Sequence, residues 1–116
     1  MLMLALSASP AAASADDIFG TWLRGDGAAH VRMAPCGKQI CATNIWIKDP
    51  ATQGEKTGDK LVFTIKPQGD EWVGSGYDPQ RHLNLSATLK ASGDAMTTTG
   101  CVLGGLICRR TKWTRM

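Results

Sequence analysis

The amino-acid sequence predicts an all-β protein, a small antiparallel up-and-down meander of about eight strands closed into a β-barrel. Two observations favour this fold class. Short runs rich in Val, Ile, Thr and Trp are separated by Gly, Pro and Asp, and no segment shows a convincing helical pattern. Closing such a meander into a barrel removes its exposed edges. A β-sandwich is the alternative, because this pattern does not distinguish one closed sheet from two packed sheets.

Each expected strand is short and is followed by turn-forming residues. The strands are expected at residues 20–24, 29–33, 40–48, 60–66, 71–77, 82–90, 95–101 and 108–115. Residues 49–59 form the longest polar connection, which makes them a candidate lid. Alternation is clearest in residues 82–90, where aliphatic side chains take every second position from Leu83 to Leu89. We therefore expect this strand to bury one face and to expose the other.

The first residues predict a signal peptide. Residues 1–15 contain an apolar stretch and end in Ala13-Ser14-Ala15, an A-x-A cleavage pattern, although no Lys or Arg precedes the apolar stretch. Cleavage there leaves residues 16–116 as a single domain in the periplasm or secreted. No other apolar run approaches the roughly 18 residues of a membrane span, so we expect no stable membrane insertion.

The four cysteines are expected to form two disulfides, because an exported small protein with an even cysteine count is usually cross-linked in this way. Bonds across two hairpins are favoured over the two crossed pairings, and they join Cys36 to Cys41 and Cys101 to Cys108. The second bond sets Met96 opposite Trp113. A zinc site is the alternative, but the spacing of the second pair exceeds the usual two to four residues.

The charge of the chain is mildly positive and unevenly distributed. A net charge of +3 is too small to indicate a nucleic-acid partner. Basic residues gather near the C-terminus, where alternation from Trp113 places Arg110 and Lys112 on one outward face. These two residues are candidate contacts for anionic envelope lipid or glycan. The alternative is an ordinary solvated face.

Two histidines supply the case for an enzyme. Together with Asp78, His30 and His82 could form an acid–base pair or a weak metal site. Isolated histidines, however, are more often surface or strand-end residues. We therefore predict no catalytic residue, no metal and no cofactor, and keep an enzyme as a minor alternative.

The four tryptophans are many for a domain of this size. Trp22 and Trp113 are expected in the core, where each indole buries a large area. Trp46 and Trp72 lie near strand ends and suit either the core or a ligand cavity. With Tyr77, they are the candidate aromatic ligand contacts.

Several strings resemble the bacterial DUF2147 family, small exported proteins with no assigned biochemical function. They are FGTW (19–22), PCGKQIC (35–41), IWIKDP (45–50), YDP (77–79) and GCVLGGLICRRTKWTR (100–115). Two departures matter. The family commonly follows its DP turn with a Gly-Lys-x-Tyr string, whereas this chain has Gln80-Arg81-His82-Leu83 there, and Ala42 stands where the family has Gly. The role of that Lys and Tyr is not transferred to this chain.

The start of the first strand is also similar to lipocalin-type barrels. There, Gly-x-Trp places an indole across the closed barrel end and a late Arg lies over its ring. The resemblance implies this role for Gly20, Trp22 and Arg115, with Arg109 as the fallback for Arg115. A guanidinium over an indole contributes roughly 0.5–2 kcal/mol to stability.

These observations predict a non-enzymatic exported barrel that binds a small or amphipathic molecule, or an envelope component, at the barrel mouth. The alternatives are an envelope scaffold with a filled interior and an enzyme that uses His30 and His82. An internal cavity of roughly 300 Å³ or more would favour the binding protein. The sequence leaves the oligomeric state open.

Overall fold

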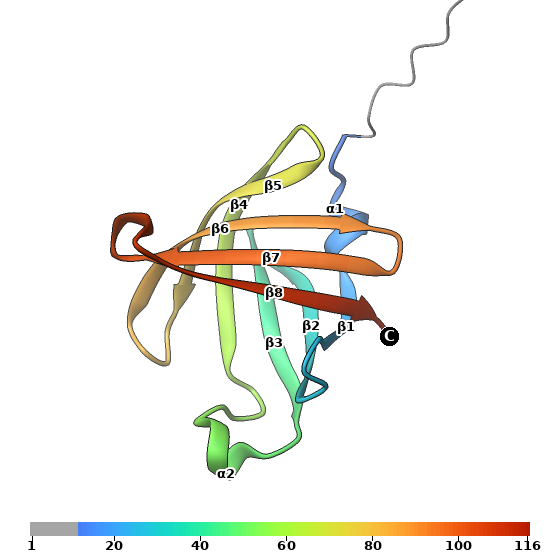
Figure 1. Cartoon of the computed structure of the whole chain (residues 1–116). Coiled ribbons are helices and arrows are strands. Elements are labelled where there is room, and N and C mark those ends of the chain that lie inside the picture. Colours follow the sequence, from blue (N-terminus) through green and yellow to red (C-terminus); the bar gives the residue numbers. More distant parts are fainter. Residues whose placement is uncertain (1–11) are drawn as a thin grey trace, which may run out of the picture.

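Eight antiparallel strands form one closed barrel in the computed structural model of the chain, which describes residues 12–116 (Figure 1). Each strand pairs with the next along the chain, and β8 returns to pair with β1. The strands are β1 (Gly20–Arg24), β2 (Ala29–Cys36), β3 (Gln39–Ile47), β4 (Lys60–Gln68), β5 (Glu71–Asp78), β6 (Leu83–Ser92), β7 (Ala95–Val102) and β8 (Ile107–Arg115). The predicted all-β meander and its barrel closure are confirmed.

Seven of the eight strands differ from the predicted bounds by one to three residues at one or both ends, and two of these differences have a clear local reason. β2 continues through Pro35 to Cys36, because Pro35 keeps its place in the ladder opposite Ile40 and the turn falls on the next two residues. His82 does not begin β6 but lies in the preceding turn, with a φ angle of 52° that suits a turn better than a strand.

Three short helical segments were not predicted. They are α1 (Ala15–Ile18), α2 (Pro50–Gln53) and the 3-10 turn η1 (Leu103–Gly105). The expectation of no helix was therefore wrong. It failed because a single helical turn is too short to show helical periodicity in the sequence. Within residues 12–116, no helix is long and apolar enough to cross a membrane. Residues 1–11 of the predicted signal peptide lie outside the described residues.

One end of the barrel is closed by α1 and by the side chain of Trp22. Trp22 and Ile18 are fully buried, and the indole Nε1–H of Trp22 donates to the carbonyl oxygen of Ile18 over 3.0 Å. The guanidinium of Arg115 lies over the indole, 4.2 Å from the ring centroid, which is the arrangement implied by the lipocalin resemblance. Its two terminal nitrogens donate to the carbonyl oxygens of Phe19 (2.7 Å) and Asp17 (2.9 Å).

Both disulfides form across hairpins as predicted. Cys36 bonds Cys41 across the β2–β3 turn, and Cys101 bonds Cys108 across the β7–β8 turn. The register of the second hairpin sets Met96 opposite Trp113, as expected. The two turns lie at opposite ends of the barrel. The Cys36–Cys41 bond is therefore at the closed end and the Cys101–Cys108 bond at the open end.

Candidate functional site

A cavity of about 1040 Å³ occupies the barrel interior and opens at the end away from α1. Its wall is predominantly apolar near the closed end. The apolar lining residues include Met33, Phe63, Leu85, Leu89, Met96 and Trp113. The barrel therefore has an open space between its walls.

Strand alternation and small residues explain why the interior stays open. The residues of β6 from Leu83 to Leu89 that the sequence assigned to one face all line the cavity. Small residues face the same space, among them Ala42, Ala87 and Gly100. A Cβ at Gly100 would meet the side chain of Leu85 at 2.9 Å, so the space beside Leu85 depends on this glycine.

Polar side chains line the cavity between its apolar closed end and its mouth. The indole Nε1–H of Trp113 donates to the hydroxyl of Thr98 over 2.9 Å, and both residues line the cavity. Thr111 and Asn44 add a hydroxyl and an amide to the lining. The wall thus changes from apolar to polar between the closed end and the mouth.

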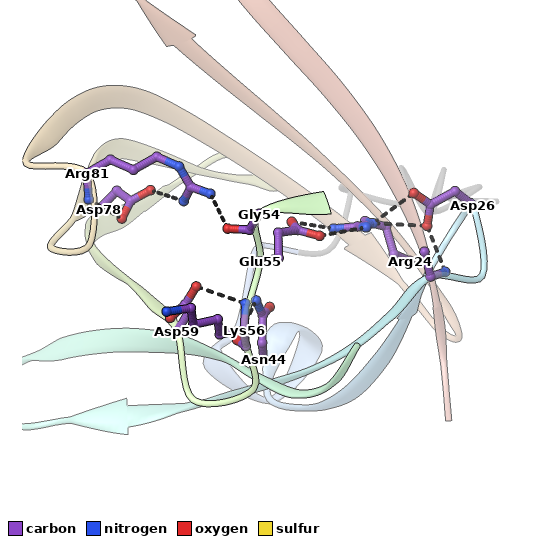
Figure 2. Close-up of polar contacts among 10 residues, drawn as sticks. Arg24, Asp26, Asn44, Gly54, Glu55, Lys56, Asp59, Asp78 and Arg81 are labelled. Carbon is purple, nitrogen blue, oxygen red and sulfur yellow. Dashed lines mark hydrogen bonds and ion pairs between the residues drawn. The ribbon is translucent and has the colours of Figure 1, made fainter. Parts of the chain in front are cut away.

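The mouth carries a row of paired charges (Figure 2). Arg24, the last residue of β1, binds both carboxylate oxygens of Glu55 at 2.8 and 3.0 Å. Its Nε also donates to Asp26 at 3.0 Å. The hydrogen bond to Glu55 raises the pKa of Arg24, and the hydrogen bond from Arg24 lowers the pKa of Asp26. Both shifts favour the charged forms of Arg24 and Asp26 at neutral pH.

A second ion pair lies across the mouth from the first. Asp78 is 6% exposed and accepts from the guanidinium of Arg81 over 2.9 Å. Burial alone would raise the pKa of Asp78, but hydrogen bonds from Arg81 and Gln80 outweigh it and hold the pKa below its usual range. The hydrogen bond to Asp78 in turn raises the pKa of Arg81.

Residues 48–59, here called the mouth segment, connect these two pairs. Arg81 donates to the carbonyl oxygen of Gly54 over 3.3 Å, and the next residue along is the Glu55 that binds Arg24 (Figure 2). α2 gives this segment its shape, with Pro50 at its first turn and Gly54 in the left-handed conformation at its end. The candidate lid is therefore anchored to the β1–β2 and β5–β6 connections.

The candidate aromatic contacts Trp46, Trp72 and Tyr77 do not line the cavity. Trp72 is 8% exposed and packs in the core cluster, with no hydrogen-bond partner in the described residues for its indole N–H. Trp46 lies on the outer surface against the ring of His30, with a centroid separation of 4.5 Å. Tyr77 is also exposed, and its hydroxyl lies 3.3 Å from Nδ1 of His82. Trp113, assigned to the core from sequence, is the tryptophan that lines the cavity.

The histidines of the enzyme alternative have different neighbours. His30 contacts Trp46 on β3, whereas His82 contacts Tyr77 on β5. Asp78 is engaged by Arg81 and Gln80, with no hydrogen bond to either histidine among the described residues. Residues 12–116 include no group of three or more His, Cys, Asp or Glu side chains able to hold a metal ion.

Basic residues of β8 border the open end of the cavity. Arg110 and Lys112 are exposed, and both contribute to the lining where β8 passes beyond its pairing with β1. Arg109 also lines the cavity and shares the strand face of Thr111 and Trp113. Its guanidinium has no hydrogen bond or ion pair within residues 12–116. Alternation from Trp113 would have identified Arg109 as the inward cation.

Comparison with known proteins identifies the family of the chain but assigns it no activity. Searches of curated proteins and of solved structures gave no significant match. The profile of DUF2147, described as an uncharacterized protein conserved in bacteria, matches residues 20–115. This range begins at the first residue of β1 and ends at the last residue of β8, so it covers the whole barrel. The chain therefore belongs to the DUF2147 family.

Proposed function

We propose that this protein binds an amphipathic small molecule with an anionic head group inside its barrel. The hollow interior carries the proposal: a cavity of about 1040 Å³ is at the upper end of the size range of small-molecule sites. An apolar tail would lie among Met33, Phe63 and Leu89, where no water-binding groups compete. No group in the described residues suggests a reaction, so the proposed role is binding.

The charges at the mouth indicate the sign of the head group. Arg24 and Arg81 are both engaged by carboxylates. Arg109 has no such partner within residues 12–116 and stands on the cavity side of β8. The carboxylate or phosphate of a ligand at the mouth would accept a charge-assisted hydrogen bond from Arg109.

The place of action proposed for the protein is outside the cytoplasm, in the periplasm or secreted. The A-x-A pattern at Ala13-Ser14-Ala15 and the two hairpin disulfides support this location. An envelope lipid or a lipid breakdown product would be an available ligand of the required chemistry there.

Binding of dodecanoate tests the proposal, together with native mass spectrometry of protein purified from a periplasmic extract. Calorimetric titration of wild type should show binding of dodecanoate. Ala42→Phe should lower the affinity by about tenfold or more, because the added ring takes space from the tail. Ala34→Phe is the matched control: it makes the same change on β2, at the position after the cavity-lining Met33, where the side chain faces outward.

The head group is tested separately with dodecanoate and uncharged dodecanol. Arg109→Gln should weaken dodecanoate binding about fivefold, equivalent to about 1 kcal/mol, and leave dodecanol binding unchanged. Arg32→Gln, at an exposed arginine on β2 that does not line the cavity, is the control. Equal binding of both probes by wild type would refute the anionic head group. A wild-type protein that binds neither probe and carries no ligand from the extract would refute the binding function itself.

A further inference from the structure

The hairpin between β7 and β8 ends in large apolar side chains that the barrel does not cover. Figure 1 shows its turn projecting beyond the barrel wall, away from the C-terminus. Leu103 is 68% exposed, Leu106 85% and Ile107 58%. We call these three residues the apolar tip. A single exposed leucine is ordinary, but three in a stretch of five residues at one extremity form a patch.

The apolar tip is held in a fixed shape. Leu103 has a φ angle of 54°, which a residue other than glycine rarely adopts, and Gly104 and Gly105 are also in the positive-φ region. The Leu106 N–H donates to the Leu103 carbonyl oxygen over 3.3 Å. The disulfide between Cys101 and Cys108 closes the base of the turn. These constraints keep Leu103 and Leu106 exposed, whereas a flexible turn could fold them back onto the barrel. Backbone strain of the kind seen at Leu103 is often found at functional sites.

Positive charge follows the apolar tip directly. We call Arg109, Arg110 and Lys112 the basic stem; all three are exposed. None of them forms an ion pair with a described residue. The chain contains no Asp or Glu from residue 95 to residue 116, so no carboxylate of this hairpin offsets the charge. The hairpin thus combines an apolar extremity with a cationic base.

We infer that the β7–β8 hairpin docks the protein on a bilayer that contains anionic phospholipid. The apolar tip would enter the interfacial region, and the basic stem would contact the lipid phosphates. A protein partner fits less well, because a stable protein interface buries roughly 1,200–2,000 Å² and a convex tip of three side chains supplies only a small part of that. A bilayer needs no shape complementary to the tip.

Docking would bring the barrel mouth toward the lipid. The β7–β8 turn lies at the same end of the barrel as the β1–β2, β3–β4 and β5–β6 connections, which surround the mouth. Arg109 belongs both to the basic stem and to the cavity lining. The docking inference does not depend on an occupied cavity, and a protein that binds no dodecanoate would still be expected to bind vesicles.

Vesicle flotation tests the inference with phosphatidylcholine vesicles, with or without phosphatidylglycerol. Wild type should float with the anionic vesicles and not with the zwitterionic ones. Leu103→Ser/Leu106→Ser should lower the partition coefficient by about tenfold or more, because the inserted apolar area is lost. Arg110→Gln/Lys112→Gln should lower it by about twentyfold at low salt and remove most of its salt dependence. Ile45→Ser, at an exposed apolar position on β3, is the control and should bind like wild type.

A spectroscopic measurement distinguishes insertion from other modes of contact. The emission of Leu106→Trp, compared with wild type, should shift to shorter wavelength when anionic vesicles are added, because the new indole leaves water. Binding of wild type with no shift in Leu106→Trp would overturn the inference, since another surface would then hold the vesicle. Failure of wild type to float would also overturn it. The inference would also be overturned if wild type sedimented as a dimer and Leu103→Ser/Leu106→Ser as a monomer. The apolar tip would then contact a second copy of the chain.

Discussion

At the scale of single residues, the closed end of the barrel depends on Gly20 and Trp22 of β1 and on Arg115 of β8, at the other end of the chain. Arg115 covers Trp22 and donates to two carbonyl oxygens around α1. Gly20 makes this possible: its φ angle is 122°, and a Cβ there would lie 2.8 Å from a guanidinium nitrogen of Arg115. The Gly-x-Trp pattern therefore has a physical reason in this chain, namely room for the arginine above the indole.

Removing the indole should destabilise the protein strongly. Trp22→Ala is expected to lower the free energy of unfolding by about 3–5 kcal/mol, as for other large buried aromatics. In a domain of this size the melting temperature should fall by roughly 15–30 °C. Trp46→Ala, at an exposed tryptophan on the outer surface, is the matched control and should cost far less. A similar small shift for both variants, followed by circular dichroism, would show that Trp22 does not close the barrel.

At the scale of elements, the mouth segment is fixed by ion pairs that local sequence patterns do not reveal. Arg24 and Glu55 are 31 residues apart, and the contact of Arg81 with Gly54 joins β5–β6 to β3–β4. Either pair on its own would be a modest surface interaction. Asp78 differs because it is buried. If its carboxylate lost its charge, water could not compensate for the weakened interactions in the folded state.

The mouth should therefore loosen in acid. The pKa of Asp78 is lowered in the folded state, so its stabilising contribution is present above the unfolded value of about 3.9 and is lost as the pH falls through the folded pKa. Asp78→Asn should cost about 1–3 kcal/mol at neutral pH, and this difference from wild type should shrink below about pH 4. Asp70→Asn, which breaks the exposed pair with Lys90, is the control. A pH-independent difference in chemical denaturation would rule out the charge of Asp78 as the cause.

Sequence patterns predicted the strands well because strand signals are local. The alternation from Leu83 to Leu89 and the short turns are visible within a few residues of each other. α1 and α2 were missed because each is one turn long, although Asp49-Pro50 and Gly54 carry start and stop signals for α2. The cavity could not be predicted, because the same inward pattern fits a filled or a hollow barrel. Its volume depends on which small residues face one another across the interior.

At the scale of the whole molecule, the open and closed ends have different roles. The closed end combines α1, Trp22 and Arg115, and the open end combines the cavity mouth, the mouth segment and the apolar tip. The two disulfides reinforce both ends. With loops this short, each is expected to contribute about 2–3 kcal/mol by restricting the unfolded chain. The barrel is thus stabilised independently of whatever occupies its interior.

Export should remove residues 1–15, and with them the first residue of α1, but leave the contact of Arg115 with Trp22 at the closed end in place. Cleavage after Ala15 removes three backbone hydrogen bonds: the Ala13 N–H donates to the Gly69 carbonyl oxygen (2.9 Å), the Asp17 N–H to that of Ser14 (3.0 Å) and the Phe19 N–H to that of Ala15 (3.2 Å). It retains Ile18 and the Asp17 carbonyl oxygen that Arg115 contacts. The chain that begins at Asp16 should therefore be about 2–4 kcal/mol less stable than the full chain, since three backbone hydrogen bonds and the cap of α1 are lost.

The export prediction is tested on protein recovered from the periplasm and the medium. Mass spectrometry should find an N-terminus at Asp16, and peptide mapping without reduction should find Cys36 joined to Cys41 and Cys101 joined to Cys108. Ala13→Leu with Ala15→Leu is the control, because signal peptidase requires small residues at these positions and the double variant should retain its leader. Protein that stays in the cytoplasm with residues 1–15 attached and its cysteines reduced would contradict the prediction. The barrel would then have to fold without its two cross-links, at a cost of about 4–6 kcal/mol, which is a large share of the stability of a small domain.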